Sequence, residues 1–312
     1  VVSVASCGVF LLFTAERLMQ ATGNTVYHMI TQLIGAVLNC VLDPIMIFGL
    51  LGCPALGTTG AALATVLSQI IAMAIGFFIN VKFNHDVHIR LRGFRPDGRI
   101  LREIVRIGLP AAMQQSLMSV LTVGFNRILM PFSQTAVGFY GIYYKLQNFL
   151  FMPIYGLNNA LIPMIGYNYG AKNRRRIERI TRYAMLLGLG IMATGTLLFE
   201  ALPVPLLRLF DASETMLAIG IPGIRIISTS FCLAGISLIL SGCMQGLGRG
   251  SESLFVALLR QLIVILPLAA LLARYSLSAV WLSFPLAEAA GLLAAALLYH
   301  RVHRQLLSGL PE

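Results

Sequence analysis

Residues 26–50 read VYHMITQLIGAVLNCVLDPIMIFGL, and Asp43 is the only Asp, Glu, Lys or Arg among them. A transmembrane helix needs about 20 consecutive, mostly apolar residues, so this stretch is long enough to span a bilayer. Its apolar run is continuous, whereas the strands of a membrane barrel alternate over about ten residues. Eight further stretches have the same character. The nine predicted transmembrane helices cover residues 1–20, 26–50, 57–81, 105–130, 135–163, 180–202, 216–243, 254–273 and 277–299.

The composition sets the class of protein. Of the 312 residues, 57% are apolar and 11% are charged, whereas about 25% of residues are charged in an ordinary globular protein. A soluble fold of this length has too much wet surface to hide so many apolar side chains. The composition therefore excludes a soluble enzyme, a disordered chain and a collagen-like fibre. It predicts an all-α polytopic membrane protein. The five cysteines show no metal-ligand spacing, so no metal site is predicted.

The basic residues indicate an orientation in the membrane. The net charge is +11, and many of the basic residues lie in the segments 82–106 and 172–182. If the nine helices alternate in direction, these segments share one side of the membrane with Arg17, Arg249, Arg301 and Arg304, and only Arg208 and Arg274 lie on the other. The positive-inside rule makes the basic side, and with it the C-terminus, cytoplasmic. The charge is then explained without a nucleic-acid partner.

Two pairs of short segments suggest an internal repeat. Met19–Asn24 (MQATGN) resembles Met244–Arg249 (MQGLGR), and Leu67–Gln69 (LSQ) resembles Leu286–Glu288 (LAE). Both pairs occupy equivalent places, so the first three predicted helices correspond to the last three. The copies are separated by an even number of helices and therefore share their orientation, which indicates a parallel repeat.

The repeat predicts the organisation of the intact protein as two six-helix lobes, of which this chain supplies helices 4–12 of twelve. We expect an N-terminally truncated fragment, with three helices preceding Val1 in the whole protein. In this scheme residues 1–81 are the second part of the N-lobe, and 82–104 are a basic cytoplasmic linker. Residues 105–300 form the C-lobe, and 301–312 form a cytoplasmic tail.

Polar residues on the predicted helix 26–50 point to a cation or proton site. Gln32, Asn39 and Asp43 share one helix face. Pro44 cannot donate to the carbonyl of Cys40, so a helix break is expected beside a carboxylate. Oxygen-rich, broken backbone at membrane depth suits a cation or a proton. The alternative is that these groups only tie helices together.

Thr65, on the predicted helix 57–81, is the third member expected at this site, where it would add a hydroxyl oxygen. Close packing of small residues is the alternative role for this helix face, because Gly60 and the alanines that follow it allow helices to approach.

A second set of polar and aromatic residues follows stripes on the predicted helices 105–130 and 135–163. Neither stripe contains an acid, and such a surface suits an amphipathic or cationic organic molecule through stacking and cation–π contacts. A polar seam between helices is the alternative. With Gln32, the residues expected to line a substrate cleft are Gln115, Ser119, Asn126, Tyr140, Tyr144 and Gln147. Lys145 faces a different direction, and the sequence allows it to be either a structural partner or a coupling group.

Other charges in or near predicted helices have simpler explanations. Arg260 and Glu288 are expected to pair across helices, which relieves the cost of both charges. Glu16 and Arg17 lie at a helix end and are expected at the membrane interface.

Several motifs together resemble the MATE (multidrug and toxic compound extrusion) transporters, in the bacterial branch that contains MepA and DinF. The resemblance covers essentially the whole chain. The motifs are MQATGN at 19–24, NCVLDP at 39–44, GAALAT at 60–65, GLP at 108–110 and SGCMQGLG at 241–248. It implies a monomeric antiporter of a bacterial inner membrane that exports small organic cations or drugs by alternating access. H⁺ or Na⁺ would be the coupling ion, and no cofactor is expected.

The resemblance also assigns residues. Asn39 and Asp43 match the family's helix 5 positions in the N-lobe cation site, and Thr65 matches its helix 6 threonine. The helix 1 aspartate of that site would precede Val1. Another branch couples through acids on helices 7 and 10, where this chain has Gln114 and Gln115 and no mid-helix acid between residues 215 and 243. Coupling is therefore expected to run through Asp43.

Two other functions are alternatives to drug export. A lipid-linked saccharide flippase of the same superfamily needs a strongly basic cleft, and the predicted helices 105–130 and 135–163 offer only Arg127 and Lys145. An intramembrane enzyme would need a motif such as H-E-x-x-H or G-x-S-x-G, and the sequence has neither. We therefore predict an antiporter rather than an enzyme.

Overall fold

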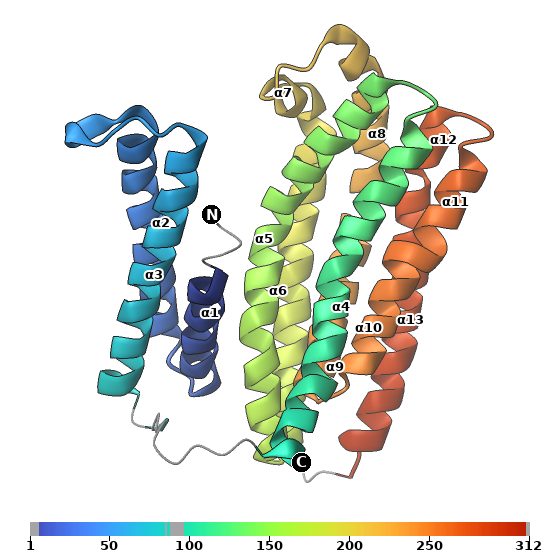
Figure 1. Ribbon diagram of the computed structural model, residues 1–312. Helices are drawn as coiled ribbons and strands as arrows, with labels where there is room; N and C mark the ends of the chain where they lie inside the picture. Colours follow the sequence, from blue (N-terminus) through green and yellow to red (C-terminus); the bar gives the residue numbers. More distant parts are fainter. Residues whose placement is uncertain (1–5, 85, 88–96, 310–312) are drawn as a thin grey trace. The chain divides into compact units, whose positions relative to one another are not determined.

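The computed structural model describes residues 6–84, 86–87 and 97–309, and all regular secondary structure in these residues is helical (Figure 1). The chain divides into two compact units, here called the N-terminal unit (Val1–Pro96) and the C-terminal unit (Asp97–Glu312). Six of the described helical segments are long and apolar enough to cross a membrane, or seven if the bent pair α8–α9 is one span. The protein is therefore an all-α polytopic membrane protein.

The N-terminal unit contains three helices: α1 (Ser6–Ala21), α2 (Thr25–Phe48) and α3 (Thr58–Phe83), with a short 3₁₀ turn at Leu50–Gly52. The helix α3 packs against both α1 and α2. Gly60 explains the close approach of α2 and α3, because a Cβ atom there would collide with the Met46 carbonyl. Asn80 fastens α3 to α1, since its side-chain amide donates to the Ala15 carbonyl at 2.8 Å.

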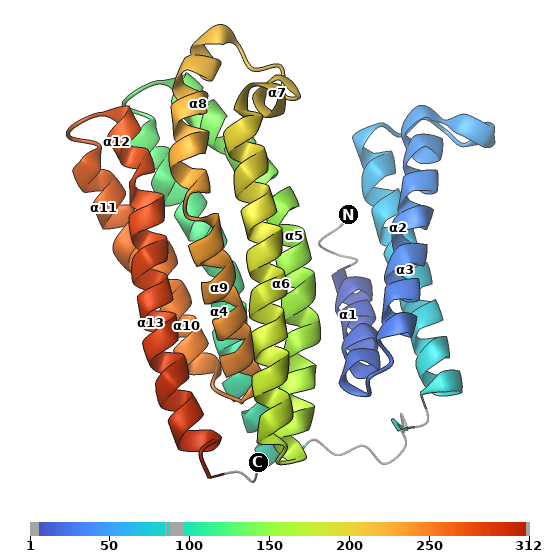
Figure 2. The same cartoon turned by 180° about the vertical axis from the view of Figure 1, so that it is seen from behind.

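The C-terminal unit is a larger bundle. Its elements are α4 (Gly98–Leu129), α5 (Gln134–Gly170), α6 (Arg174–Ala201), α7 (Pro203–Arg208), α8 (Glu214–Ser228), α9 (Phe231–Gly246), α10 (Gly250–Leu258), the π-turn η2 (Leu259–Val264), α11 (Ile265–Leu272), α12 (Leu277–Trp281) and α13 (Ser283–Leu306). The helix α9 packs against α5, α6 and α13 (Figure 2). Aromatic side chains such as Phe125, Phe139 and Trp281 fill the core between these helices.

All nine predicted segments correspond to helices, but several boundaries were wrong. The helix α4 begins at Gly98 instead of 105, because the Asp97 side chain caps it by accepting from the Arg99 amide at 2.8 Å. The helix α6 begins at Arg174 instead of 180, because Asn173 accepts from the Arg176 amide at 3.0 Å. The predicted linker 82–104 and tail 301–312 are partly helical, since α3 ends at Phe83, α4 begins at Gly98 and α13 ends at Leu306. Residues 1–5 of the first predicted helix, 85 and 88–96 of the linker, and 310–312 of the tail lie outside the described residues. Of the predicted spans, α1 and α4 are not among the helices long and apolar enough to cross a membrane.

The seventh predicted helix, 216–243, is not straight. It divides into α8 and α9, which are bent by 47° across Thr229 and Ser230. The eighth contains the π-turn η2 between α10 and α11. Hydropathy gives no sign of either feature, because both parts of each predicted helix are apolar.

The repeated motif has the same backbone in both units. After α1 the backbone N–H of Asn24 donates to the Met19 carbonyl at 2.8 Å. After α9 the backbone N–H of Arg249 donates to the Met244 carbonyl at 2.8 Å. Gly23 and Gly248 hold positive φ angles of 81° and 76° in these turns. Glycine is required there because other residues rarely adopt such angles. The resemblance between MQATGN and MQGLGR is thus a shared turn, not only a shared composition.

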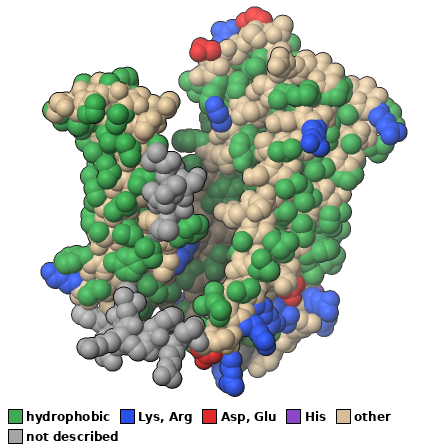
Figure 3. Space-filling model, viewed as in Figure 1, with side chains coloured by type: hydrophobic (Ala, Val, Ile, Leu, Met, Phe, Trp, Pro, Cys, Tyr) green, Lys and Arg blue, Asp and Glu red, His purple; other side chains and the backbone are tan. Residues whose placement is uncertain are grey.

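Most of the basic side chains of the C-terminal unit gather at one end of the bundle. Helices α4, α6 and α10 begin there, and α5, α9 and α13 end there (Figure 1). The stretch Lys172–Arg176 and the residues Arg249, Arg301 and Arg304 therefore lie at this basic end, part of which is visible in Figure 3. Arg208 and Arg274 lie at the opposite end, as does Arg127 near the C-terminus of α4, which the prediction did not place there.

Candidate functional site

The three residues expected at the cation site come together between α2 and α3 of the N-terminal unit. The Asn39 side-chain amide donates to the Asp43 carboxylate at 3.3 Å and to the Thr65 hydroxyl oxygen at 3.4 Å. The Thr65 hydroxyl donates in turn to the Ala61 carbonyl at 2.9 Å. All three side chains are half-buried. The arrangement places carboxylate, amide and hydroxyl groups within reach of one another.

The sequence explains why these groups meet. Asn39 and Asp43 are four residues apart, so they are neighbours on one face of α2. Thr65 reaches them because small residues bring α3 close to α2: Gly60 lies against the Met46 backbone, and Gly35 lies against Ala72.

Pro44 does not break the helix, contrary to prediction. The helix α2 continues through it to Phe48 and ends where Gly49 adopts a left-handed conformation with a φ of 74°. Packing against α3 supports the last turn, so the missing hydrogen bond is tolerated. Pro44 still has no N–H, and the Cys40 carbonyl therefore lacks its helical donor one turn from Asp43.

Oxygen-rich groups of this kind favour a hard cation or a proton over a transition metal. The described residues contain no group of three or more His, Cys, Asp or Glu side chains that could hold a metal ion. In the Asn39–Asp43–Thr65 cluster, Asp43 supplies the one carboxylate.

A second polar cluster lies nearer the α1–α2 turn and involves Gln32. Gln32 is exposed, and its side-chain amide donates to Glu16 at 2.9 Å. His28 lies 3.8 Å from the same carboxylate oxygen. Glu16 was expected at the membrane interface, but it is only 1% exposed, because α3 packs over this side of α1. One signal of this cluster is visible in the sequence, since His28 and Gln32 share a helix face with Asn39.

The expected cleft residues of the C-terminal unit divide into two groups. Gln115 and Ser119 on α4 are exposed, and Asn126, Tyr144 and Gln147 are half-buried.

Tyr140 differs from that expectation. It is 2% exposed and stacks on Phe125 with ring centroids 4.8 Å apart, so it is a core residue in this structure. The aromatic stripe of α5 packs against α4 and α13, and this packing covers the Tyr140 ring.

The neighbouring residue Lys145 is exposed, and its ammonium lies 5.8 Å from the Phe210 ring. It borders an apolar groove of about 1240 Å³ between α5 and α6.

The predicted pair of Arg260 and Glu288 is confirmed. The guanidinium donates to the carboxylate at 3.2 Å, and both side chains are largely buried. Arg260 lies on the π-turn η2 and passes over Gly291 of α13, where a Cβ atom would lie 3.1 Å from the arginine side chain. A neighbouring amide network was not predicted: the Gln245 side chain donates to Gln114 at 3.0 Å and to Ser253 at 2.9 Å.

Comparison with known proteins places the chain among transporters. The MatE family profile matches residues 110–271. The multidrug export protein MepA of Staphylococcus aureus strain MSSA476 is 30% identical over 299 residues, which is 96% of this chain. MepA of Staphylococcus saprophyticus is 27% identical over 298 residues. This chain spans 65% of the length of each of these relatives.

Solved structures agree on the fold. A MATE structure in complex with MaL6 superimposes with a TM-score of 0.87 at 25% identity, over 97% of this chain and 69% of the other. A MOP superfamily transporter from Pyrococcus furiosus, whose binding pocket is described as having reverse polarity, gives a TM-score of 0.81 at 26% identity, over 90% of this chain and 64% of the other. With the profile match, the shared fold and the α2–α3 motifs in agreement, the chain belongs to the MATE family of transporters.

Proposed function

We propose that this chain is part of a secondary active antiporter that exports small organic cations or drugs in exchange for H⁺ or Na⁺. The observation that carries the proposal is the Asn39–Asp43–Thr65 cluster, one carboxylate held at half-buried depth in an apolar helix pair. An ionisable group inside a transmembrane segment is expensive and usually marks an ion pathway. The names of the MepA relatives, multidrug export proteins, support drugs as the substrates.

The geometry suggests how ion binding changes the site. The Asn39 nitrogen lies between the Asp43 and Thr65 oxygens, so it occupies the place that a cation would need. A proton on Asp43, or Na⁺ beside it, makes the amide turn and present its oxygen instead. The hydrogen bond from the Asn39 nitrogen to the Thr65 hydroxyl is then lost. Because Pro44 has already removed one hydrogen bond from α2, this helix can bend near Asp43 and drive alternating access.

We assign the substrate contacts to Gln115, Ser119, Asn126, Tyr144 and Gln147, with Tyr140 supporting them from the core. Their amides, hydroxyls and rings can hold an organic cation by hydrogen bonds and cation–π contacts. We further propose that residues 1–81 and 105–300 belong to two lobes of a monomer in a bacterial inner membrane. The basic end of the C-terminal unit, with the C-terminus, would face the cytoplasm.

The flippase alternative rests on Lys145. This exposed lysine beside an apolar groove is the feature that would suit an anionic lipid-linked substrate. A single cation is a weak site for a pyrophosphate, which usually binds several basic groups or backbone amides. Export of organic cations therefore remains the preferred proposal.

The test is efflux of ethidium from cells that express the chain within its full open reading frame, under an imposed pH or Na⁺ gradient. We expect Asp43→Asn to abolish gradient-driven efflux while the protein level stays normal. The matched control is Asp211→Asn, an exposed position with a φ of 53° that asparagine tolerates. Equal efflux from wild type and Asp43→Asn would remove Asp43 from the mechanism. Efflux from neither would favour the flippase.

A further inference from the structure

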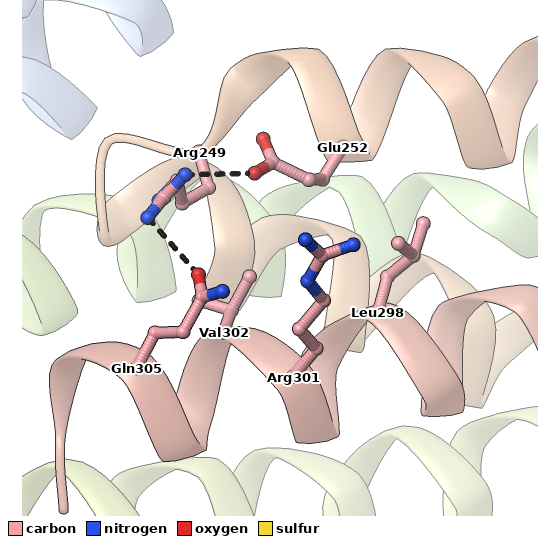
Figure 4. Close-up of a pocket in the computed structure, with 6 residues that line it drawn as sticks. All are labelled: Arg249, Glu252, Leu298, Arg301, Val302 and Gln305. Carbon is pink, nitrogen blue, oxygen red and sulfur yellow. Dashed lines mark hydrogen bonds and ion pairs between the residues drawn. The ribbon is translucent and has the colours of Figure 1, made fainter.

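A pocket of about 360 Å³ opens at the basic end of the C-terminal unit. It lies between the first turn of α10 and the last turns of α13, and its lining residues are Arg249, Glu252, Leu298, Arg301, Val302 and Gln305 (Figure 4). Three of these side chains are charged and two are aliphatic. Pockets of this size are sufficient for a small polar headgroup.

One arginine of the pocket is fixed in place. The Arg249 guanidinium donates to Glu252 at 3.1 Å and to Gln305 at 3.2 Å, so its direction is set from two sides. Glu252 is thereby neutralised by a partner that belongs to the same pocket. A carboxylate in this state repels an incoming anion less than a free one.

The second arginine is available. Arg301 extends from α13 toward α10 and Glu252 (Figure 4), and it makes no hydrogen bond or ion pair with any residue in 6–84, 86–87 or 97–309. With Arg249 and Glu252 counted, the pocket carries one net positive charge. An arginine fork binds phosphate oxygens in a bidentate manner, which makes a phosphate group the natural anion for this place.

The surroundings favour a phosphate that carries an acyl chain. Leu298 and Val302 form an apolar wall of the pocket. Leu293 and Leu297, eight and four residues before Arg301, share its helix face, and each is 63% exposed. An apolar stripe therefore leads from Arg301 along α13 toward the middle of the helix.

The position of Arg301 along α13 also suits contact with a lipid headgroup. It lies 18 residues after Ser283, which is about 27 Å along an α-helix. Arg301 also lies near the C-terminal end of the span Leu277–Leu306, and because the hydrocarbon core of a bilayer is about 30 Å thick, we place its guanidinium near the headgroup layer. Basic pockets between helices at this depth bind anionic lipid headgroups in other membrane proteins.

We propose that this pocket is a binding site for the headgroup of an anionic phospholipid. Arg301 holds the phosphodiester, Arg249 orients it, and an acyl chain follows Leu297 and Leu293. The site is independent of the proposed ion and substrate sites, and its test does not depend on transport.

The test is native mass spectrometry of the purified chain in a neutral detergent. Titration compares phosphatidylglycerol, phosphatidylcholine and inorganic phosphate. We expect tight binding of phosphatidylglycerol only, weakened roughly tenfold or more by Arg301→Glu. The control is Arg304→Glu, which makes the same charge change on α13 at an exposed position outside the pocket. Arg301→Gln repeats the test without a charge reversal.

Three results would overturn the proposal. Equal weakening by Arg301→Glu and Arg304→Glu would mean that lipid is attracted by the basic end in general. Equal binding of phosphatidylcholine would mean that the phosphate is not held by charge. Displacement of phosphatidylglycerol by inorganic phosphate at similar concentration would mean a site for free phosphate instead of lipid.

Discussion

At the scale of single residues, Asn39 is the group on which the candidate ion site depends. Among the residues that the structure describes, its amide nitrogen is the one group that hydrogen-bonds to both the Asp43 carboxylate and the Thr65 hydroxyl. The two hydrogen bonds are long, at 3.3 and 3.4 Å. Long bonds in a half-buried site are weak, because hydrogen bonds lose strength with distance. A site that must release its ion benefits from contacts that are easily exchanged.

Thr65→Val tests the contribution of the hydroxyl oxygen. The change keeps the shape of the side chain but removes an oxygen from the site, so we expect reduced ethidium efflux with unfolding stability changed by only about 1 kcal/mol. Thr194→Val is the matched control, because the Thr194 hydroxyl also donates to a carbonyl four residues earlier, at 2.9 Å, and is exposed. Efflux and the thermal midpoint are measured for both. Normal efflux in Thr65→Val would exclude its hydroxyl from ion binding.

At the scale of elements, the small residues on α2 and α3 let the two helices pack closely enough to bring the three residues of the candidate ion site together. Asn39, Asp43 and Thr65 were identified from helix periodicity and the family motifs, since a face with residues four apart is visible in sequence. The continuity of α2 through Pro44 was not predictable, because it depends on packing against α3. The burial of Glu16 likewise depends on tertiary contacts that periodicity does not report.

Gly60→Ala tests this packing. The added methyl would meet the Met46 carbonyl, and forcing extra volume into packed positions typically costs about 1–3 kcal/mol. We expect a lower thermal midpoint and weakened efflux, because α3 must move away from α2 and carry Thr65 with it. Gly156→Ala, in α5, is the control: nothing lies within 4 Å of its added methyl, so it should be neutral or slightly stabilising. Equal effects of the two substitutions would show that backbone freedom matters rather than contact.

At the scale of the whole molecule, few charges are available and each buried one needs a partner. Hydropathy predicted the all-α class, since 57% of the chain is apolar, but two of the nine predicted spans, α1 and α4, are not among the helices long and apolar enough to cross a membrane. The bend between α8 and α9 and the π-turn at Arg260 were missed, because they change the path of a helix without changing its composition. The pairing of Arg260 with Glu288 was predictable from the free-energy cost of burial alone, since a lone charge inside the membrane is unfavourable.

Arg260→Gln makes that cost measurable in the C-terminal unit. Removing one partner of a buried ion pair typically destabilises by about 3–5 kcal/mol, because the other charge stays buried. In the variant, Glu288 avoids this cost by taking up a proton, so stability should be retained at pH 5 and lost progressively as the pH rises to 8. Tyr143 and Tyr155 of α5 carry phenols whose ordinary pKa is about 10, so neither is expected to titrate between pH 5 and pH 8. The double variant Arg260→Gln/Glu288→Gln has no charge to bury, and its thermal midpoint should not depend on this pair. The contrary result is a thermal midpoint of Arg260→Gln that varies with pH no more than the midpoint of the double variant. It would show that Glu288 is hydrated when its arginine is missing. The ion pair would then contribute little to holding η2 against α13.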